Sequence, residues 1–275
     1  MMNLSLHKQF TKIFIATLTV VILFSCEKVI KIDIKDAEVQ TVVEAFVNSE
    51  MGDNQVILSK SANFYEANNF PMIKGADVVI TTNDAQYQLQ EIQDGIYHHP
   101  DLGKLSKDTY KLIIKIEDQI ISSESVMPNL VPIDSLTYVE DAEGHPGGGG
   151  NNSGTTYKLY LNFDDPGETD NYYKIRITNI TSFTDETVYV NDALFNGRNA
   201  KLPVTRAMPG DSVVVSLFSI DKANYEYFKL LEANNMGAFT TSVGNPVSNV
   251  SGENVIGVFG AYALSIDTLG LPPIK

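Results

Sequence analysis

Alternation of apolar and polar residues dominates the chain. In TYKLIIKI (109–116), every even-numbered position is apolar, whereas Lys111 and Lys115 fall on the opposite face. The same two-residue period recurs in YKLYLNF (157–163) and YYKIRIT (172–178). This period predicts half-buried strands of an antiparallel sheet. Further strands are predicted near 41–47, 55–60, 76–82, 86–91, 119–126, 136–140, 187–191 and 212–220.

One segment near the end of the chain departs from this alternation. NVIGVFGAYALSI (254–266) is apolar on both faces and carries glycines within the run. Such a pattern predicts a central strand that is covered on both sides, with glycines at positions of close packing.

A single helix is predicted near 221–235. Asp221 can cap its first turn, and Asn235 and Gly237 can end it. The apolar positions with helical spacing are Ala223, Tyr227, Leu230 and Leu231. This stripe predicts core contact against a sheet.

The fold class predicted from these patterns is all-β and mainly antiparallel, with two β-sandwich-like domains. Two prolines interrupt strand-like sequence in MPNLVPIDS (127–135), which places the boundary there. Residues 26–130 then form an immunoglobulin-like or prealbumin-like sandwich, and residues 131–275 form a second β-rich domain with the helix packed on it. Between two predicted strands, the polar, glycine-rich stretch 140–156 predicts a mobile hairpin connection.

The amino terminus carries a targeting signal. Residues 1–12 contain two lysines and no acidic residue, and IFIATLTVVILF (13–24) is apolar apart from two threonines. A basic region before an apolar stretch of this length is typical of a secretory signal peptide and is too short to span a membrane as a helix. The alternative is a buried core helix, which would stand alone before an all-β chain.

The only cysteine, Cys26, stands directly after this apolar run. LFSC (23–26) resembles a bacterial lipobox, in which the cysteine is diacylated and becomes the new amino terminus, although Phe24 is larger than usual. Residues 1–25 are therefore predicted to be removed, which leaves 18 basic and 34 acidic residues and a net charge of −16. Multiple acyl chains give stable membrane anchoring. The alternative is a plain buried or free thiol.

Charge and composition narrow the function classes. The formal net charge of −14 argues against nucleic acid as a partner and against adsorption to anionic lipid through a basic patch. One cysteine excludes an internal disulfide framework and a thiolate-rich zinc site. Tryptophan is absent, which argues against a sugar site built on tryptophan platforms.

Few residues are candidates for a catalytic or metal-binding site. Adjacent His98 and His99 would point to opposite faces of a strand, and their surroundings indicate an exposed turn. The stretch NFDDPGETDNYY (162–173) gathers carboxylates between two strands; it predicts a hairpin turn, with calcium binding or glycoside hydrolysis as alternatives. These carboxylates are Asp164, Asp165, Glu168 and Asp170. We therefore predict no catalytic residue, no metal site and no cofactor.

Several ordered segments resemble one protein family. They are CEKVIKIDI after the lipobox, VVEAFV, GADVVIT, MP…VPIDSL, FDDPGETDNYYKIRI, SIDKANYEYFKLLE, NPVSNVSGE and GVFGAYA. This set is similar to the Bacteroidota outer-membrane lipoprotein family catalogued as domain of unknown function 4249, over residues 26 to about 268. The resemblance implies an outer-membrane lipoprotein, often encoded beside a TonB-dependent transporter, with no assigned activity. Only Glu27 directly after Cys26 matches the acidic surface-export signal of that phylum.

The function expected is that of a non-enzymatic accessory or binding component, anchored in the outer membrane and working with a TonB-dependent transporter, a nutrient ligand, or both. Cell-surface exposure is compatible with this expectation. The alternatives are a structural or adhesive surface module, and a hydrolase that uses the carboxylates around 164–170.

Overall fold

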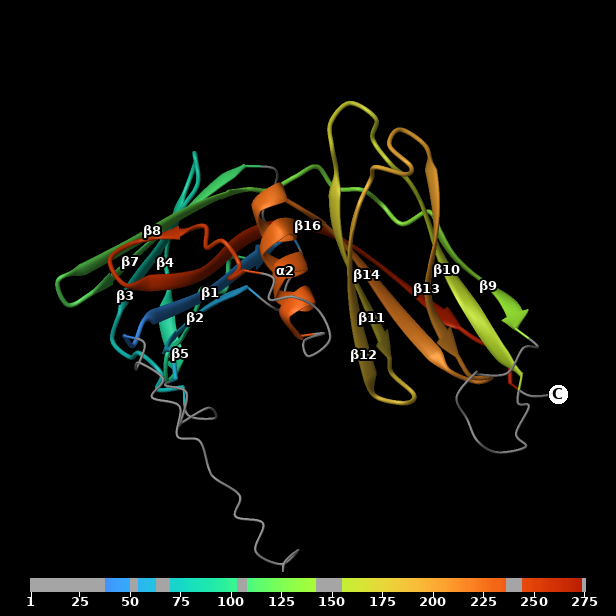
Figure 1. The fold of residues 1–275 in the computed structure, drawn as a ribbon, viewed down its shortest axis with the longest axis horizontal. Helices are drawn as coiled ribbons and strands as arrows, with labels where there is room; N and C mark the ends of the chain where they lie inside the picture. The colour runs from blue at the N-terminus through green and yellow to red at the C-terminus, as the bar shows by residue number, and fades with distance from the viewer. Residues whose placement is uncertain are drawn as a thin grey trace, which may run out of the picture. The chain divides into compact units, whose positions relative to one another are not determined.

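The alternating segments form strands. The structure is a computed structural model, and it describes residues 38–49, 54–62, 70–102, 108–141, 155–235 and 244–273. Most strand pairs are antiparallel; β1 and β16 form a parallel pair. The fold class predicted from the sequence, all-β and mainly antiparallel with one packed helix, is therefore confirmed (Figure 1).

The structure has sixteen described strands and one described helix, with the following bounds. The strands are β1 Thr41–Asn48, β2 Gln55–Lys60, β3 Asp77–Thr81, β4 Gln86–Gln88, β5 Gln90–Gln93, β6 Ile96–His98, β7 Thr109–Ile116, β8 Gln119–Val126, β9 Ser135–Asp141, β10 Thr156–Asp164, β11 Tyr172–Asn179, β12 Thr184–Asn191, β13 Asn199–Ala207, β14 Ser212–Ile220, β15 Val250–Ser251 and β16 Val255–Gly270; the helix is α2 Lys222–Asn235.

The last strand joins two groups of strands into one sheet. The eight-stranded sheet has the order β12-β11-β14-β16-β1-β2-β6-β5. The first part of β16, Val255–Tyr262, pairs with β1, and the second part, Ala263–Gly270, pairs with β14. Residues 257–264 are all buried, which confirms the prediction of a central, doubly covered strand.

A first hydrophobic core lies between two sheets. The five-stranded sheet β15-β8-β7-β3-β4 and the strands β1, β2, β6 and β16 contribute side chains to one buried cluster. Its residues come mainly from 43–127, together with the start of β16. Tyr110, Leu112 and Ile114 point into it while Lys111 and Lys115 are exposed, as the alternation predicts.

A second core lies between the three-stranded sheet β13-β10-β9 and the strands β11 and β14. Its buried members in the two predicted strands are Leu159, Leu161 and Phe163 of β10 and Tyr173, Ile175 and Ile177 of β11. Val131 is the earliest residue of this cluster, and Leu271 is the last. The two cores thus meet along the chain near 127–131 and again at β16; the two-domain division at residue 130 stays a prediction.

The helix α2 packs on the sheet with a different face from the predicted one. Asp221 caps it, since its Oδ1 accepts a 2.8 Å hydrogen bond from the backbone N–H of Asn224. Asn224 is fully buried, and Phe228 stacks on Tyr189 at 5.1 Å, whereas Ala223 and Leu231 are exposed. The predicted stripe was wrong at Ala223 and Leu231, because the hydrogen-bonded Asn224 occupies the contact face, whereas Tyr227 and Leu230 are half-buried.

Three further expectations need correction. The surroundings of His98 and His99, predicted as an exposed turn, include strand β6 at 96–98, which pairs with both β2 and β5, and a turn follows at 99–102. Strand β13 carries Pro203 and was not predicted. The carboxylate-rich segment after β10 is no hairpin turn, because β10 and β11 belong to different sheets.

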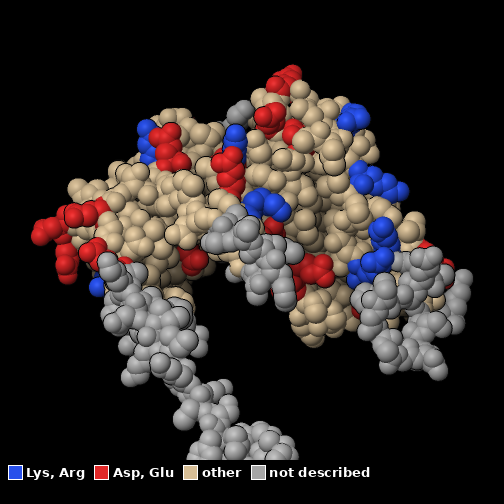
Figure 2. Space-filling view, in the orientation of Figure 1, with Lys and Arg blue, Asp and Glu red and all other residues tan. Residues whose placement is uncertain are grey.

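The surface distribution of charge is uneven. On the face shown in Figure 2, Asp and Glu side chains lie over much of the molecule, while Lys and Arg side chains gather over β10 and β13.

Candidate functional site

A cavity of about 790 Å³ opens at one end of the first core. It lies where β1 and β16 begin, where β2 ends, and beside the turn between β7 and β8. Its size falls within the range of small-molecule sites, roughly 300–1,000 Å³. The lining residues are Thr41, Lys60, Met72, Ile73, Lys74, Gly75, Ile116, Glu117, Asp118, Gln119, Ile120, Glu253 and Asn254.

One wall is the segment 71–75, which lies along β2. The backbone N–H of Ile73 donates to the carbonyl of Leu58, and that of Lys60 donates to the carbonyl of Pro71. Tyr97 of β6 holds the segment from the core side: its hydroxyl donates to the carbonyl of Ile73 and accepts from the N–H of Ala76, both at 3.0 Å. Burial raises the pKa of Tyr97 above its ordinary value of 10.0.

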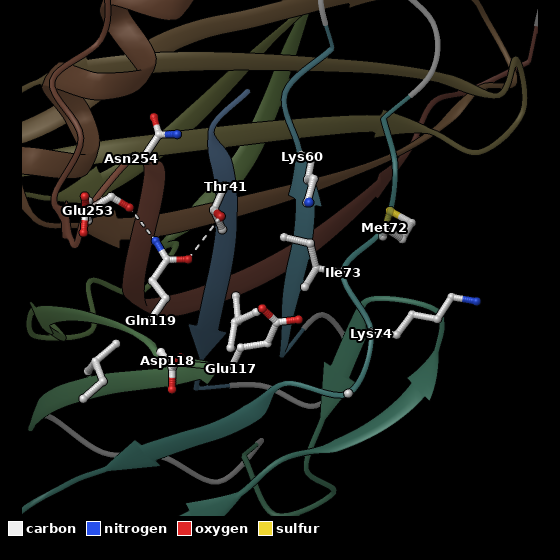
Figure 3. A pocket seen from close by; sticks show the side chains of 13 residues that line it. Thr41, Lys60, Met72, Ile73, Lys74, Glu117, Asp118, Gln119, Glu253 and Asn254 are labelled. Carbon is white, nitrogen blue, oxygen red and sulfur yellow. Dashed lines mark hydrogen bonds between the residues drawn. The ribbon is translucent and has the colours of Figure 1, made fainter. Parts of the chain in front are cut away.

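The opposite wall is held together by Gln119, the first residue of β8. Its Nε2 donates to the carbonyl of Glu253, and the hydroxyl of Thr41 lies 3.5 Å from its Oε1 (Figure 3). Asn254 joins the same corner, because its carbonyl accepts from the N–H of Thr41 at 3.0 Å. Three segments far apart in sequence therefore meet around one amide side chain.

The two lysines of the cavity differ in their pairing. Lys74 forms a 2.6 Å ion pair with Asp94, which raises its pKa, and in Figure 3 its side chain extends away from the other labelled residues. Lys60 has no ion-pair partner among the described residues. The cavity's three acidic residues, Glu117, Asp118 and Glu253, are exposed at turns, so the cavity presents charges of both signs to solvent.

The lining of this cavity is mainly polar and charged. Amide, hydroxyl, ammonium and carboxylate groups surround a partly apolar floor formed by Met72, Ile73 and Ile116. Its described lining contains no His, Cys or Ser, and the described parts of the chain contain no cluster of three or more His, Cys, Asp or Glu side chains that could hold a metal ion. The arrangement suits a polar ligand that carries charge.

A second polar feature joins the helix to β16. Asp221 accepts a 2.6 Å hydrogen bond from the hydroxyl of Ser125 on β8, and the same oxygen of Ser125 accepts from the N–H of Ala261. The amide of Asn249 pairs with both backbone groups of Phe259, at 2.9 and 2.7 Å. The segments SIDKANYEYFKLLE, NPVSNVSGE and GVFGAYA thus meet in one hydrogen-bonded network, whose role in the geometry is structural.

The carboxylates singled out from the sequence are used by the fold. Asp165 is buried and accepts from the hydroxyl of Tyr173 at 2.5 Å and from the N–H of Gly197 at 3.0 Å. Asp164 accepts from the amide of Asn199 at 2.9 Å. Glu168 and Asp170 are exposed, so the structure does not assemble the four carboxylates around a common site.

The remaining sequence candidates lie elsewhere. The Nδ1 of His99 accepts from the N–H of Asp101, and its ring contacts Tyr87 at 5.4 Å. Cys26, the signal segment 1–25 and most of the 140–156 loop lie outside the described residues, although the antiparallel pairing of β9 with β10 gives that loop hairpin ends. Within the residues that the structure describes, no helix is long and apolar enough to cross a bilayer.

Sequence reasoning did not find the cavity. Its residues come from the ends of strands and from turns at 41, 72–75, 116–120 and 253–254, and no local pattern links these stretches. Two non-glycine lining residues, Glu117 and Asn254, have positive φ angles of 50° and 52°, which the tight turns at these positions impose.

The fold and the cavity define a mainly antiparallel β protein with a polar site at the end of one sheet pair. The sequence matches the family described as Domain of unknown function (DUF4249) over residues 27–265, and the chain belongs to this family. No curated protein matches the chain. Among solved structures, a two fibronectin type-III domain segment from chicken tenascin is similar, with a TM-score of 0.21 and 10% identity over 67% of this chain and 90% of that chain.

Proposed function

We propose that this protein is a lipid-anchored outer-membrane lipoprotein that serves as a non-enzymatic accessory or binding component of a TonB-dependent transporter in nutrient uptake. The observation that carries the binding role is the 790 Å³ cavity with exposed groups of both charges. The anchor and the transporter follow from the lipobox-like sequence at Cys26 and from the family resemblance. The nutrient would be polar and charged.

The length of chain before the cavity is compatible with a role near the membrane. Residues 27–40 separate Cys26 from Thr41, which lines the cavity. A fully extended chain of this length spans at most about 50 Å. A lipid on Cys26 would therefore keep the cavity within about 50 Å of the membrane surface, close enough to pass a ligand to a transporter.

Complementation of a deletion strain tests this proposal. The wild-type gene and a Lys60→Ala/Glu117→Asn double variant are compared on the nutrients whose uptake the deletion impairs. Asn at 117 tolerates the positive φ of the turn. The matched control, Lys111→Ala/Glu124→Asn, removes an exposed ion pair of the five-stranded sheet. Like the cavity variant, it removes one positive and one negative charge.

We expect the control to restore growth fully and the cavity variant to restore it at least fivefold less at limiting nutrient. Normal growth of the deletion strain on every nutrient would contradict the transport role. Full complementation by the cavity variant would contradict the role of the cavity.

A further inference from the structure

The outward face of the three-stranded sheet carries an unusual group of side chains. Lys158 and Tyr160 of β10 alternate with the buried Leu159 and Leu161, so they point away from the core. Arg206 and Lys201 of β13 are exposed beside them, since Lys158 pairs in register with Arg206 and Asn162 with Lys201. We call these four residues, Lys158, Tyr160, Lys201 and Arg206, the basic tyrosine face.

Tyr160 lies at the centre of this face. The Nζ of Lys158 is 5.5 Å from its ring centroid, and the Nζ of Lys201 is 4.8 Å away. These are distances at which an aromatic ring attracts a cation. The register places Lys158 two residues before Tyr160 and Lys201 opposite Asn162, two residues after it, so the ring stands between the two ammonium groups.

The pairing of the other cations makes this face distinctive. Neither Lys158 nor Lys201 has an ion-pair or hydrogen-bond partner among the described residues. Most other described cations have a carboxylate within 4.0 Å; they are Lys74, Lys111, Lys115, Arg176, Lys222 and Lys229. In a chain with a net charge of −14, two neighbouring lysines without a carboxylate are a site of local positive potential.

A shallow cavity of about 360 Å³ adjoins the face. Lys158 and Arg206 line it together with Pro203 and Thr205, and Glu186 of β12 is the acidic residue at its edge. The hydroxyl of Thr205 donates to the Oε1 of Glu186 at 3.4 Å. The cavity thus offers cations on one side, a hydroxyl and a carboxylate that can hydrogen-bond sugar hydroxyls, and an apolar proline surface.

We propose that the basic tyrosine face binds a short acidic saccharide. Carboxylates on neighbouring sugars would accept charge-assisted hydrogen bonds from Lys158 and Lys201, one on each side of Tyr160. The apolar surface of the sugar between them would pack on the part of the Tyr160 ring that neither ammonium group covers. The surrounding acidic protein repels long polyanions and anionic bilayers, so an oligosaccharide with few charges fits better than nucleic acid or a membrane.

This inference is independent of the proposed function, because the face and the polar cavity described above lie on different sheets. The test measures binding of tri-galacturonic acid to the full-length protein in detergent by calorimetry. Neutral galactotriose is the matched ligand without carboxylates. The variant Lys158→Gln/Lys201→Gln is compared with Lys111→Gln/Lys115→Gln, which removes two exposed, ion-paired lysines from β7.

We expect the acidic trimer to bind at least tenfold more tightly than the neutral one. The Lys158→Gln/Lys201→Gln variant should lose at least tenfold in affinity, Tyr160→Leu should lose about fivefold, and the Lys111→Gln/Lys115→Gln control should bind like the wild type. Near-ultraviolet circular dichroism checks that each variant is folded.

Three outcomes would overturn the inference. The first is equal affinity for the acidic and neutral trimers, or no binding of either. The second is unchanged affinity in the folded Lys158→Gln/Lys201→Gln variant. The third is binding to phosphatidylglycerol vesicles without binding to the acidic trimer, which would assign the face to membranes.

Discussion

The hydroxyl of Tyr262 on β16 donates a 2.8 Å hydrogen bond to the Oδ1 of Asn224 on α2, and both side chains are buried. The Nδ2 of Asn224 donates in turn to Asp221 at 2.9 Å and to the carbonyl of Phe259 at 3.0 Å. One asparagine thereby fixes the helix to the strand that is shared by both cores.

Replacing Tyr262 by Phe tests this link. The change leaves the buried Oδ1 of Asn224 without its donor, and an unsatisfied buried polar atom costs about 1–3 kcal/mol. We expect the free energy of unfolding in urea to fall by that amount. Tyr138→Phe is the control, because Tyr138 is 41% exposed, and it should change the free energy by less than about 0.5 kcal/mol. Equal effects of the two substitutions would contradict the link.

The parallel pairing of β1 with β16 depends on Gly257. Its φ is 145°, and a Cβ built on it would lie 2.0 Å from the carbonyl oxygen of Val43. Gly257→Ala should therefore separate the two strands and destabilise the protein by more than about 3 kcal/mol, or prevent folding.

Gly270→Ala is the matched control on the same strand, because a Cβ there meets nothing within 4 Å. It should leave the midpoint of thermal unfolding nearly unchanged. A folded Gly257→Ala protein with the same midpoint as Gly270→Ala would contradict the observed pairing.

Alkaline pH should destabilise the protein through its buried tyrosines. Burial raises the pKa of Tyr110, Tyr173 and Tyr262 above the ordinary value of 10.0. Because the pKa is higher in the folded state, stability is complete below pH 10 and falls as pH rises, when the unfolded chain releases protons that the folded chain retains. Each such tyrosine costs about 1.4 kcal/mol per pH unit above 10.

Absorbance at 295 nm measures this effect directly, since the chain contains no tryptophan. We expect the exposed tyrosines to ionise first and the buried ones to ionise only with unfolding, in a cooperative step. A single smooth titration of all tyrosines in the folded protein would contradict the burial of these rings.

Alternation along the chain was enough to predict most strands, because a half-buried strand shows its two faces in its own residues. It could not predict which strands pair. The two registers of β16, with β1 and with β14, depend on segments that lie far from it in sequence. Strand β13 was not predicted because it contains Pro203, which is unfavourable inside a sheet. It is an edge strand, where a missing backbone N–H is tolerated.

The sites were less predictable than the strands. The cavity is assembled from turns around Gln119, and the basic tyrosine face becomes visible only when β10 and β13 are placed side by side. On the helix, apolar spacing indicated Ala223 and Leu231, but the buried position is Asn224, whose burial depends on partners from β16. The cavity, the basic tyrosine face and the buried face of the helix all depend on contacts between distant segments, and local sequence patterns do not predict such contacts.

The proposed lipid anchor has its own test. Cys26→Ala removes the thiol to which the lipid would be attached, so metabolic labelling with an alkyne fatty acid should mark the wild-type protein and not the variant. Ser25→Ala keeps a small residue before the cysteine and should remain labelled. Labelling of Cys26→Ala, or none of the wild type, would contradict lipidation at this residue.

Affinity purification of the tagged lipoprotein from detergent-solubilised outer membranes tests the central proposal most directly. We expect one TonB-dependent transporter to be enriched with the wild-type protein and to be absent from a mock purification with an unrelated outer-membrane lipoprotein. Recovery of the intact lipoprotein without any such transporter, together with normal growth of the deletion strain on all nutrients, would contradict the proposed function.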